Sequence, residues 1–178
     1  MLFQYRKLMK LNKNLVLIGM MGSGKSLIGK ILSKKLNLDF IDTDQEIVKI
    51  EKKTITEIFK NKGEKYFRNI EEAISLEALK LNNKVIALGG GGYMSLSIRK
   101  YTIKKCITFW LNWKNETLIN RIKHGKKRPL ATTLSDLELN KLIIKRSRMY
   151  ILSDYKINCD KLDKKKIVEK IINFYENS

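Results

Sequence analysis

The chain has very few of the residues that build disulfide frameworks, zinc sites or histidine-based catalytic sites. Its 178 residues include two cysteines, one histidine and one proline. Cys106 and Cys159 have no C-x-x-C or Cys/His spacing, so we expect two small apolar side chains in a reducing compartment. His124 lies alone in a basic loop. The sequence therefore has too few cysteine and histidine residues for a metal site built from them or for a catalytic histidine dyad.

Long apolar segments are also missing. No apolar run approaches the ~20 residues that a membrane-spanning helix needs. Residues 1–14 are basic and polar and lack the continuous apolar stretch of a secretory signal, so we expect a plain N-terminal extension. These features predict a cytoplasmic protein with no membrane partner.

Negative charge is scarce: 18 Asp and Glu residues face 37 Lys and Arg residues, for a formal net charge of +19. Such an excess favours nucleic acid, anionic membranes or anionic small substrates as partners. The basic residues are spread along the whole chain rather than gathered in one tract. We therefore expect lysine-rich solvated faces and no specific nucleic-acid partner.

The length and the 43% hydrophobic fraction indicate one globular domain over residues 1–178. Apolar runs typical of strands alternate with helical patterns, which predicts an α/β protein with a parallel sheet flanked by helices. The expected strands are Leu15–Ile18, Asp39–Ile41, Lys84–Ala87, Cys106–Leu111 and Tyr155–Asn158. The expected helices are Lys25–Leu36, Thr54–Lys62 (opened by a capping box at Thr54), Glu64–Lys80, Trp113–Lys123, Ser135–Met149 and Asp163–Glu176.

The most specific motif is Gly19-Met20-Met21-Gly22-Ser23-Gly24-Lys25-Ser26, a phosphate-binding P-loop between a predicted strand and a predicted helix. Its glycines let backbone N–H groups surround phosphate oxygens, and the helix N-terminus adds a favourable dipole. Lys25 is expected to reach the β- and γ-phosphates, and the Ser26 hydroxyl to ligate Mg²⁺. The motif predicts nucleotide binding and leaves the phosphoryl acceptor open.

Two carboxylates follow the second predicted strand in Asp42-Thr43-Asp44. Placed at the carboxyl end of a parallel strand, they would lie beside the crevice where ligands bind in open α/β sheets. One can hold Mg²⁺ through water and the other can orient or deprotonate a hydroxyl. A D-x-D sequence at a turn is also a common helix cap, and this alternative stays open.

Three further groups lie downstream. Arg68 and Glu71 share a helical face, either as a surface salt bridge or as a guanidinium held to capture a carboxylate. The glycines at 89–92 directly follow a predicted strand and favour close approach of the backbone to a substrate. The basic segment around Arg128 is either a solvated loop or a mobile lid over the phosphoryl group.

In this order, the residues resemble the shikimate kinase family, over nearly the whole chain from Leu15 to about Tyr175. The resemblance rests on the P-loop, Asp42, Asp44, the run from Ile55 to Phe59, Gly63-Glu64, Phe67-Arg68, Glu71, Gly89–Gly91, Arg128-Pro129-Leu130, Arg146 and Tyr150. It implies a three-layer P-loop kinase fold with a five-stranded parallel sheet. It also implies an acceptor-binding region at about residues 43–71 and a mobile lid at about residues 122–134.

The resemblance implies transfer of the γ-phosphoryl group of ATP to the 3-hydroxyl of shikimate, a step towards chorismate and the aromatic amino acids, with ATP as co-substrate and Mg²⁺. We expect a monomer. The implied catalytic residues are Lys25, Asp44 as base, and Arg128 in the lid. ATP would contact Gly22, Ser23, Gly24, Lys25, Ser26, Leu27, Arg121 (stacked on adenine) and Arg128. Shikimate would contact Asp44, Arg68, Gly90, Gly91 and Arg146, and Mg²⁺ would contact Ser26 and Asp42.

Three alternatives compete with this interpretation. Gluconate kinases and nucleoside monophosphate kinases share the P-loop and the lid but do not require the other residues in this order. A nucleotide-dependent nucleic-acid-binding protein would need a clustered basic face with exposed aromatic side chains. A non-catalytic binding module is disfavoured by the intact Lys25, Asp44 and Arg128.

Overall fold

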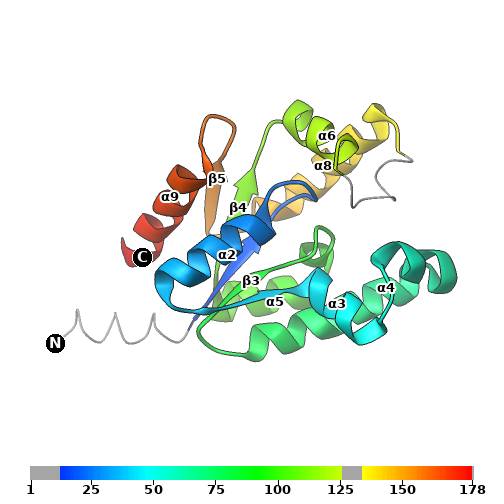
Figure 1. The fold of residues 1–178 in the computed structure, drawn as a ribbon, viewed down its shortest axis with the longest axis horizontal. Coiled ribbons are helices and arrows are strands. Elements are labelled where there is room, and N and C mark those ends of the chain that lie inside the picture. Colours follow the sequence, from blue (N-terminus) through cyan, green and yellow to red (C-terminus); the bar gives the residue numbers. More distant parts are fainter. Residues whose placement is uncertain (1–12, 126–133, 178) are drawn as a thin grey trace.

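The computed structural model describes residues 13–125 and 134–177. Its strands form one parallel five-stranded sheet in the order β2-β3-β1-β4-β5 (Figure 1). The strands are β1 (Asn14–Ile18), β2 (Asp39–Asp42), β3 (Lys84–Ala87), β4 (Cys106–Asn112) and β5 (Tyr155–Asn158). The structure confirms the five predicted strands, with bounds that differ by no more than one residue at either end.

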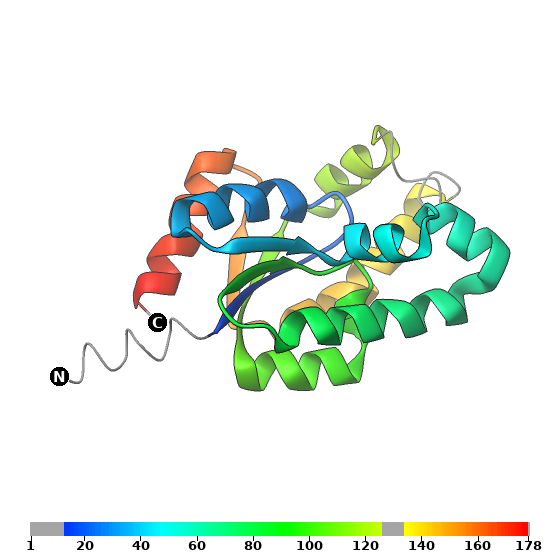
Figure 2. The same ribbon diagram turned by 60° about the horizontal axis from the view of Figure 1, so that its bottom comes forward.

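Helices cover both faces of the sheet (Figures 1 and 2). The described helices are α2 (Lys25–Leu36), α3 (Thr43–Glu51), α4 (Ile55–Lys80), the 3₁₀ helix η1 (Gly92–Met94), α5 (Leu96–Lys105), α6 (Asn115–Lys123), α8 (Asp136–Tyr150) and α9 (Lys164–Asn177). Leu15 and Leu17 of β1 pack in an apolar cluster with residues of α2, α6, α8 and α9. Val16 and Ile18 belong to a second cluster with residues of α4 and α5. The alternation along β1 therefore builds a core on each face, as a central strand requires.

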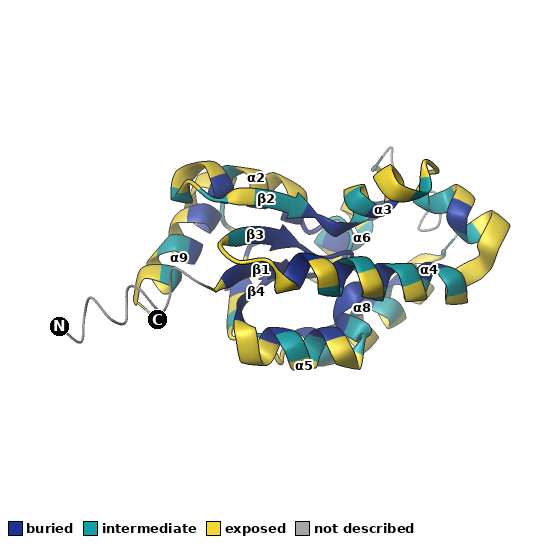
Figure 3. Cartoon of the chain, turned by 90° about the horizontal axis from the view of Figure 1, so that it is seen from below, coloured by how far each residue is buried: buried dark blue, intermediate teal, exposed yellow. Residues whose placement is uncertain are grey.

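A smaller apolar cluster lies away from the sheet. Ile47 of α3 packs with Ile58 and Phe67 of α4, and all three side chains are buried. Figure 3 shows α3 and the adjoining part of α4 beyond the strands of the sheet. This lobe carries Asp44 and Arg68, so its packing positions two of the predicted site residues.

The structure corrects the prediction for Asp42 and Asp44. Asp42 ends β2, but Asp44 lies in the first turn of α3, a helix that the sequence analysis did not predict. The Asp42 carboxylate accepts hydrogen bonds from the backbone N–H groups of Asp44 and Gln45, at 3.1 and 3.3 Å. Asp42 is therefore the N-cap that starts α3, in agreement with the helix-cap alternative.

Helix α5 was also missed, although Ser95 caps it by accepting from the N–H of Ile98. The predicted break at Gly63 is confirmed: this residue has φ 80° and ψ 171° inside α4. Residues with a Cβ rarely adopt that conformation, so Gly63 is where the helix changes direction.

Three loops that carry the predicted chemistry meet at one end of the sheet. They follow β2, β3 and β1, which are neighbours in the sheet, so the carboxyl ends of these strands lie together. This is where ligands bind in open α/β folds. Arg128, Pro129 and most of the predicted lid lie outside the described residues. Among the described residues, no helix is long and apolar enough to span a membrane.

Candidate active site

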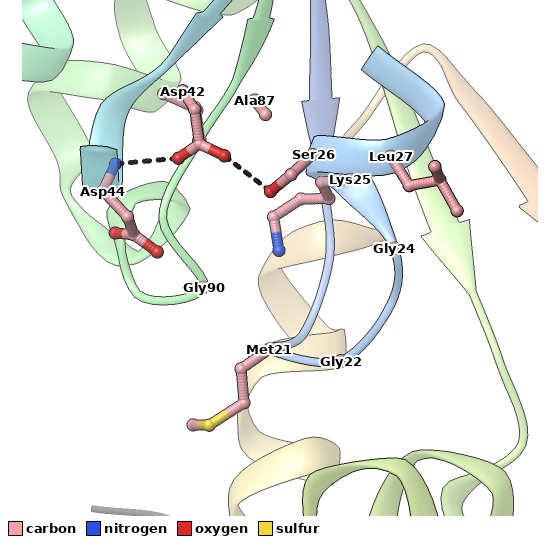
Figure 4. A pocket seen from close by; sticks show the side chains of 11 residues that line it. Met21, Gly22, Gly24, Lys25, Ser26, Leu27, Asp42, Asp44, Ala87 and Gly90 are labelled. Carbon is pink, nitrogen blue, oxygen red and sulfur yellow. Dashed lines mark hydrogen bonds between the residues drawn. The ribbon is translucent and has the colours of Figure 1, made fainter. Parts of the chain in front are cut away.

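The P-loop joins β1 to α2 and lines a cavity of 290 Å³ (Figure 4). Helix α2 begins after Gly24 and has no side-chain hydrogen bond at its N-cap, whereas α3, α4, α5 and α8 are each capped by a side chain. Gly24, Lys25, Ser26 and Leu27 line the cavity. An uncapped helix N-terminus with this Gly-rich loop is suited to phosphate oxygens.

Lys25 lies over the P-loop and is buried. Its ammonium donates to the carbonyl oxygens of Gly19 and Met20, at 2.8 and 3.1 Å. In Figure 4 the Lys25 ammonium and the Asp44 carboxylate point into the same space. A positive charge held here, opposite the Asp44 carboxylate, can neutralise phosphate oxygens.

Ser26 and Asp42 bring two hard oxygen ligands together. The Ser26 hydroxyl donates to Oδ2 of Asp42 at 2.5 Å, and both residues line the cavity. Among the described residues, no group of three or more His, Cys, Asp or Glu side chains is arranged for a metal. One hydroxyl and one carboxylate nevertheless fit Mg²⁺, which keeps several waters and takes further oxygens from substrate phosphates.

Asp44 has the most perturbed environment among the cavity carboxylates. Burial raises its pKa to about 6, and the negative charges of Glu71 and Asp42 act in the same direction, while Lys25 and Arg68 oppose the shift. A carboxyl with a pKa near 6 is mostly ionised at neutral pH and is more basic than an ordinary aspartate. These are the properties of a general base.

The glycine run after β3 is packed against charged side chains. A Cβ added to Gly89 would overlap carboxylate oxygens of Asp44 and Glu71. At Gly91 a Cβ would overlap the guanidinium of Arg68, and at Gly90 it would lie 3.0 Å from the Met21 nitrogen and 3.5 Å from Nη1 of Arg146. A side chain at 89 or 91 would therefore displace these charged groups from their present positions.

Arg68 and Arg146 are each held in place. Nη1 of Arg68 donates to the buried Glu71 carboxylate at 2.6 Å, and Nε and Nη2 donate to Glu64 at 3.3 and 3.2 Å. Burial opposes the positive charge, but Glu71 and Glu64 outweigh it and raise the pKa of Arg68. Arg146 is buried and donates to the Met20 sulfur at 3.6 Å.

These contacts separate the predicted residues into neighbouring groups. Asp44 and Gly90 share the cavity with the P-loop, while Arg68 and Gly91 line an adjoining cavity of 230 Å³. Nη1 of Arg146 lies beside Gly90, 3.5 Å from where a Cβ at that position would be. The guanidinium carbon of Arg121 lies 3.5 Å from the ring centroid of Trp113, which itself donates to the P-loop carbonyl of Ser23. Ser23 is buried and does not line the cavity. The first cavity therefore holds most of the predicted nucleotide and metal residues together with Asp44 and Gly90, while Arg68, Gly91 and Arg121 lie outside it.

The sequence analysis missed several supporting residues. Glu64 was named with the family motif, but its i,i+4 pairing with Arg68 was not predicted although the spacing allows it. Tyr150 was noted, but not that its hydroxyl donates to the Gly90 carbonyl at 2.5 Å. Trp113 donates from its indole nitrogen to the Ser23 carbonyl at 2.9 Å, a contact across 90 positions that no local pattern predicts.

The site combines a P-loop on a parallel sheet, a carboxylate with a raised pKa that faces the loop (Asp44), and two arginines beside the glycine run (Arg68 and Arg146). This combination defines a small-molecule kinase of the P-loop class. The family model for shikimate kinase matches residues 21–176. The chain is 40% identical to shikimate kinase from Bartonella henselae, with 90% of this chain and 77% of that protein covered. It is 38% identical to the enzyme from Persephonella marina, with 90% and 97% covered. The chain belongs to the shikimate kinase family.

Solved structures agree. Shikimate kinase from Acinetobacter baumannii in complex with shikimate has a TM-score of 0.87 at 28% identity, with 94% of this chain and 95% of that chain covered. The enzyme from Aquifex aeolicus has a TM-score of 0.82 at 32% identity, with 92% and 96% covered. A gluconokinase from Sinorhizobium meliloti reaches a TM-score of 0.55 at 17% identity, with 94% and 95% covered, which is a likeness of fold alone. The protein is thus an ATP-dependent kinase, as the resemblance in the sequence predicted.

Proposed function

We propose that this site transfers the γ-phosphoryl group of ATP to the 3-hydroxyl of shikimate, giving shikimate 3-phosphate and ADP. The observation that carries the proposal is the position of Asp44. It shares one cavity with the P-loop residue Lys25 and with Gly90, and Arg68 and Arg146 flank the glycine run beyond. A substrate that places a hydroxyl between Asp44 and the P-loop could therefore place a carboxylate at Arg68 and Arg146.

We propose the following residue roles, which this geometry and the family resemblance support. Asp44 accepts the proton of the attacking hydroxyl while the new oxygen–phosphorus bond forms and the bond to the ADP oxygen breaks. Lys25 and the N–H groups at the start of α2 hold the phosphates. Arg68 and Arg146 bind the shikimate carboxylate, with the backbone of Gly90 and Gly91 beside them. Arg121 stacks on the adenine ring, and Gly22, Ser23, Gly24 and Leu27 complete the nucleotide contacts.

We further propose that Ser26 and Asp42 hold Mg²⁺, which would neutralise phosphate charge when bound. The facing oxygens of the two side chains support this assignment. Arg128 remains the proposed lid arginine on sequence grounds, as does the acceptor region at about residues 43–71. A cytoplasmic monomer that acts on small molecules, without a specific nucleic-acid partner, also remains our proposal.

An acceptor panel tests the function. ADP release is measured with Mg²⁺ and ATP against shikimate, gluconate and nucleoside monophosphates at equal concentrations. Of these acceptors, we expect only shikimate to give rapid turnover. Background rates with shikimate and turnover with gluconate or a nucleotide would overturn the acceptor assignment while leaving the kinase class intact. Light scattering of the same preparation tests the monomer.

A further inference from the structure

Trp113 has an unusual position between the nucleotide loop and a charged side chain. It follows β4, and only 8% of its surface is exposed. Its indole N–H donates to the Ser23 carbonyl in the P-loop at 2.9 Å. The guanidinium carbon of Arg121 lies 3.5 Å from the centroid of its ring. One side chain therefore contacts both the phosphate loop and Arg121.

Arg121 is an exposed residue even though its guanidinium lies against the Trp113 ring. A planar group that is covered on one side explains both facts. Cation–π and planar stacking are favourable on either face of a guanidinium, so its second face can receive another flat aromatic group.

Two sets of contacts hold Trp113 and helix α6, which carries Arg121, in place. Trp113 packs in the core cluster with Leu118 and Ile122 of α6. The N-terminus of α6 is tied to the segment after β5, because Asp160 accepts from the Lys114 N–H and the Thr117 hydroxyl, both at 2.8 Å. Among the described residues, no carboxylate forms an ion pair with Arg121, so the aromatic ring is what orients it.

We propose that Trp113 is a positioning residue that sets the plane of Arg121 against the P-loop and so strengthens binding of the nucleobase of ATP. The proposal rests on the proposed function in taking ATP as the nucleotide and Arg121 as the side chain that stacks on its base. Its prediction is specific: losing the indole weakens recognition of the base and leaves recognition of the phosphates in place. A purely structural role would weaken both ligands or neither.

The test measures Kd for Mg²⁺–ATP and for inorganic tripolyphosphate without acceptor. In Trp113→Leu we expect ATP to bind roughly five- to twenty-fold more weakly, with tripolyphosphate unchanged. Trp113→Phe, which keeps an aromatic face, should fall in between. Phe109→Leu is the matched control, because it removes an aromatic ring from the same core cluster and should leave both affinities unchanged. Combined with Arg121→Ala, the loss should be less than additive.

Equal weakening of ATP and tripolyphosphate would mean that Trp113 acts through the P-loop, and would overturn the proposal. Unchanged ATP affinity or a fully additive double variant would also overturn it. If Trp113→Leu does not fold, the Trp110→Phe variant leaves Trp113 as the single tryptophan of the chain. Its fluorescence should then respond to ATP and not to tripolyphosphate, and equal responses would contradict the proposal. Because no acceptor is present, these outcomes do not depend on whether shikimate is the substrate.

Discussion

At the scale of single residues, the proposed acceptor site consists of positive and negative side chains packed against the glycine segment after β3. Asp44 and Glu71 lie against Gly89, and Arg68 lies against Gly91. The Arg68–Glu71 contact holds the arginine side chain in place, and each neighbouring charge shifts the pKa of Asp44: like charges raise it and unlike charges lower it. Glu71 therefore has two effects: it holds Arg68 and makes Asp44 a stronger base.

The pH dependence of the reaction should report Asp44. Its pKa is raised to about 6, so the base form appears as pH rises through that value. We expect kcat/KM for shikimate to increase between about pH 5 and pH 7 and then level off. Glu71→Gln removes a negative charge that raises this pKa, and the rising limb should move to lower pH. A limb that stays in place would contradict the assignment.

Asp44→Asn should lose most of kcat and the rising limb together. The variant should also be no less stable than the wild type at pH 8, because the pKa of Asp44 is raised in the folded state. A carboxyl whose pKa is higher in the folded than in the unfolded state favours folding at low pH, and this contribution is lost as pH rises through about 6. Asparagine avoids that loss, so thermal unfolding at pH 8 should show a Tm equal to or above the wild type. A lower Tm would point to misfolding instead of a missing base.

Arg146 and Arg148 offer a matched pair on α8, because Arg146 is buried against Gly90 and Arg148 is exposed. Arg146→Ala should weaken shikimate binding by about 1.5–3 kcal/mol, the range for a lost hydrogen bond to a charged group. ATP binding should change little. Arg148→Ala should behave as the wild type in calorimetric titrations with either substrate. Equal effects of the two variants would sink the carboxylate assignment.

At the scale of elements, sequence patterns were informative where apolar periodicity was strong. The buried run at β1 and the capping box at Thr54 were both predicted and both present. Helix α5 was missed because only Ile98 and Thr102 are buried in it, which is too few to set up a helical pattern. Helix α3 was missed because the D-x-D sequence favoured a strand end, although the same aspartate caps the helix.

The site residues divide in the same way. Lys25, Ser26 and the glycine run belong to local motifs, so their place at the carboxyl ends of the strands could be predicted. The contact of Tyr150 with Gly90 and that of Trp113 with Ser23 join residues 60 and 90 positions apart. Such contacts depend on how the helices pack and leave no trace in local spacing.

The kink at Gly63 gives a test at this scale. With φ 80° and ψ 171°, and with no atom within 4 Å of an added Cβ, Gly63→Ala introduces backbone strain and no clash. We expect a loss of about 1–3 kcal/mol in the free energy of unfolding. The segment of α4 after the kink carries Arg68, so KM for shikimate should rise while KM for ATP stays within about twofold. Lys60→Ala, an exposed change one turn earlier, should alter neither. Unchanged stability in Gly63→Ala would show that the kink is not strained by a side chain.

At the scale of the whole molecule, the net charge of +19 is larger than the proposed site requires. Basic side chains lie on α2, α4, α5 and α9, which cover opposite faces of the sheet (Figure 2). Nucleic acid is bound tightly when cations line one groove and neutralise successive phosphates. Charge spread over several faces instead attracts polyanions without a fixed register.

We therefore expect duplex and single-stranded DNA to bind weakly and without structure preference at ~150 mM salt, where exposed charges more than about 8 Å apart are largely screened. Affinity should rise steeply as the salt is lowered, because released counterions drive such binding. Anisotropy titrations at several salt concentrations, run with and without ATP and shikimate, measure both trends. A sub-micromolar complex at ~150 mM salt that prefers one DNA structure would give the charge a dedicated role. Loss of that complex when ATP and shikimate are bound would place the DNA-binding surface at the substrate site that contains Lys25 and Asp44.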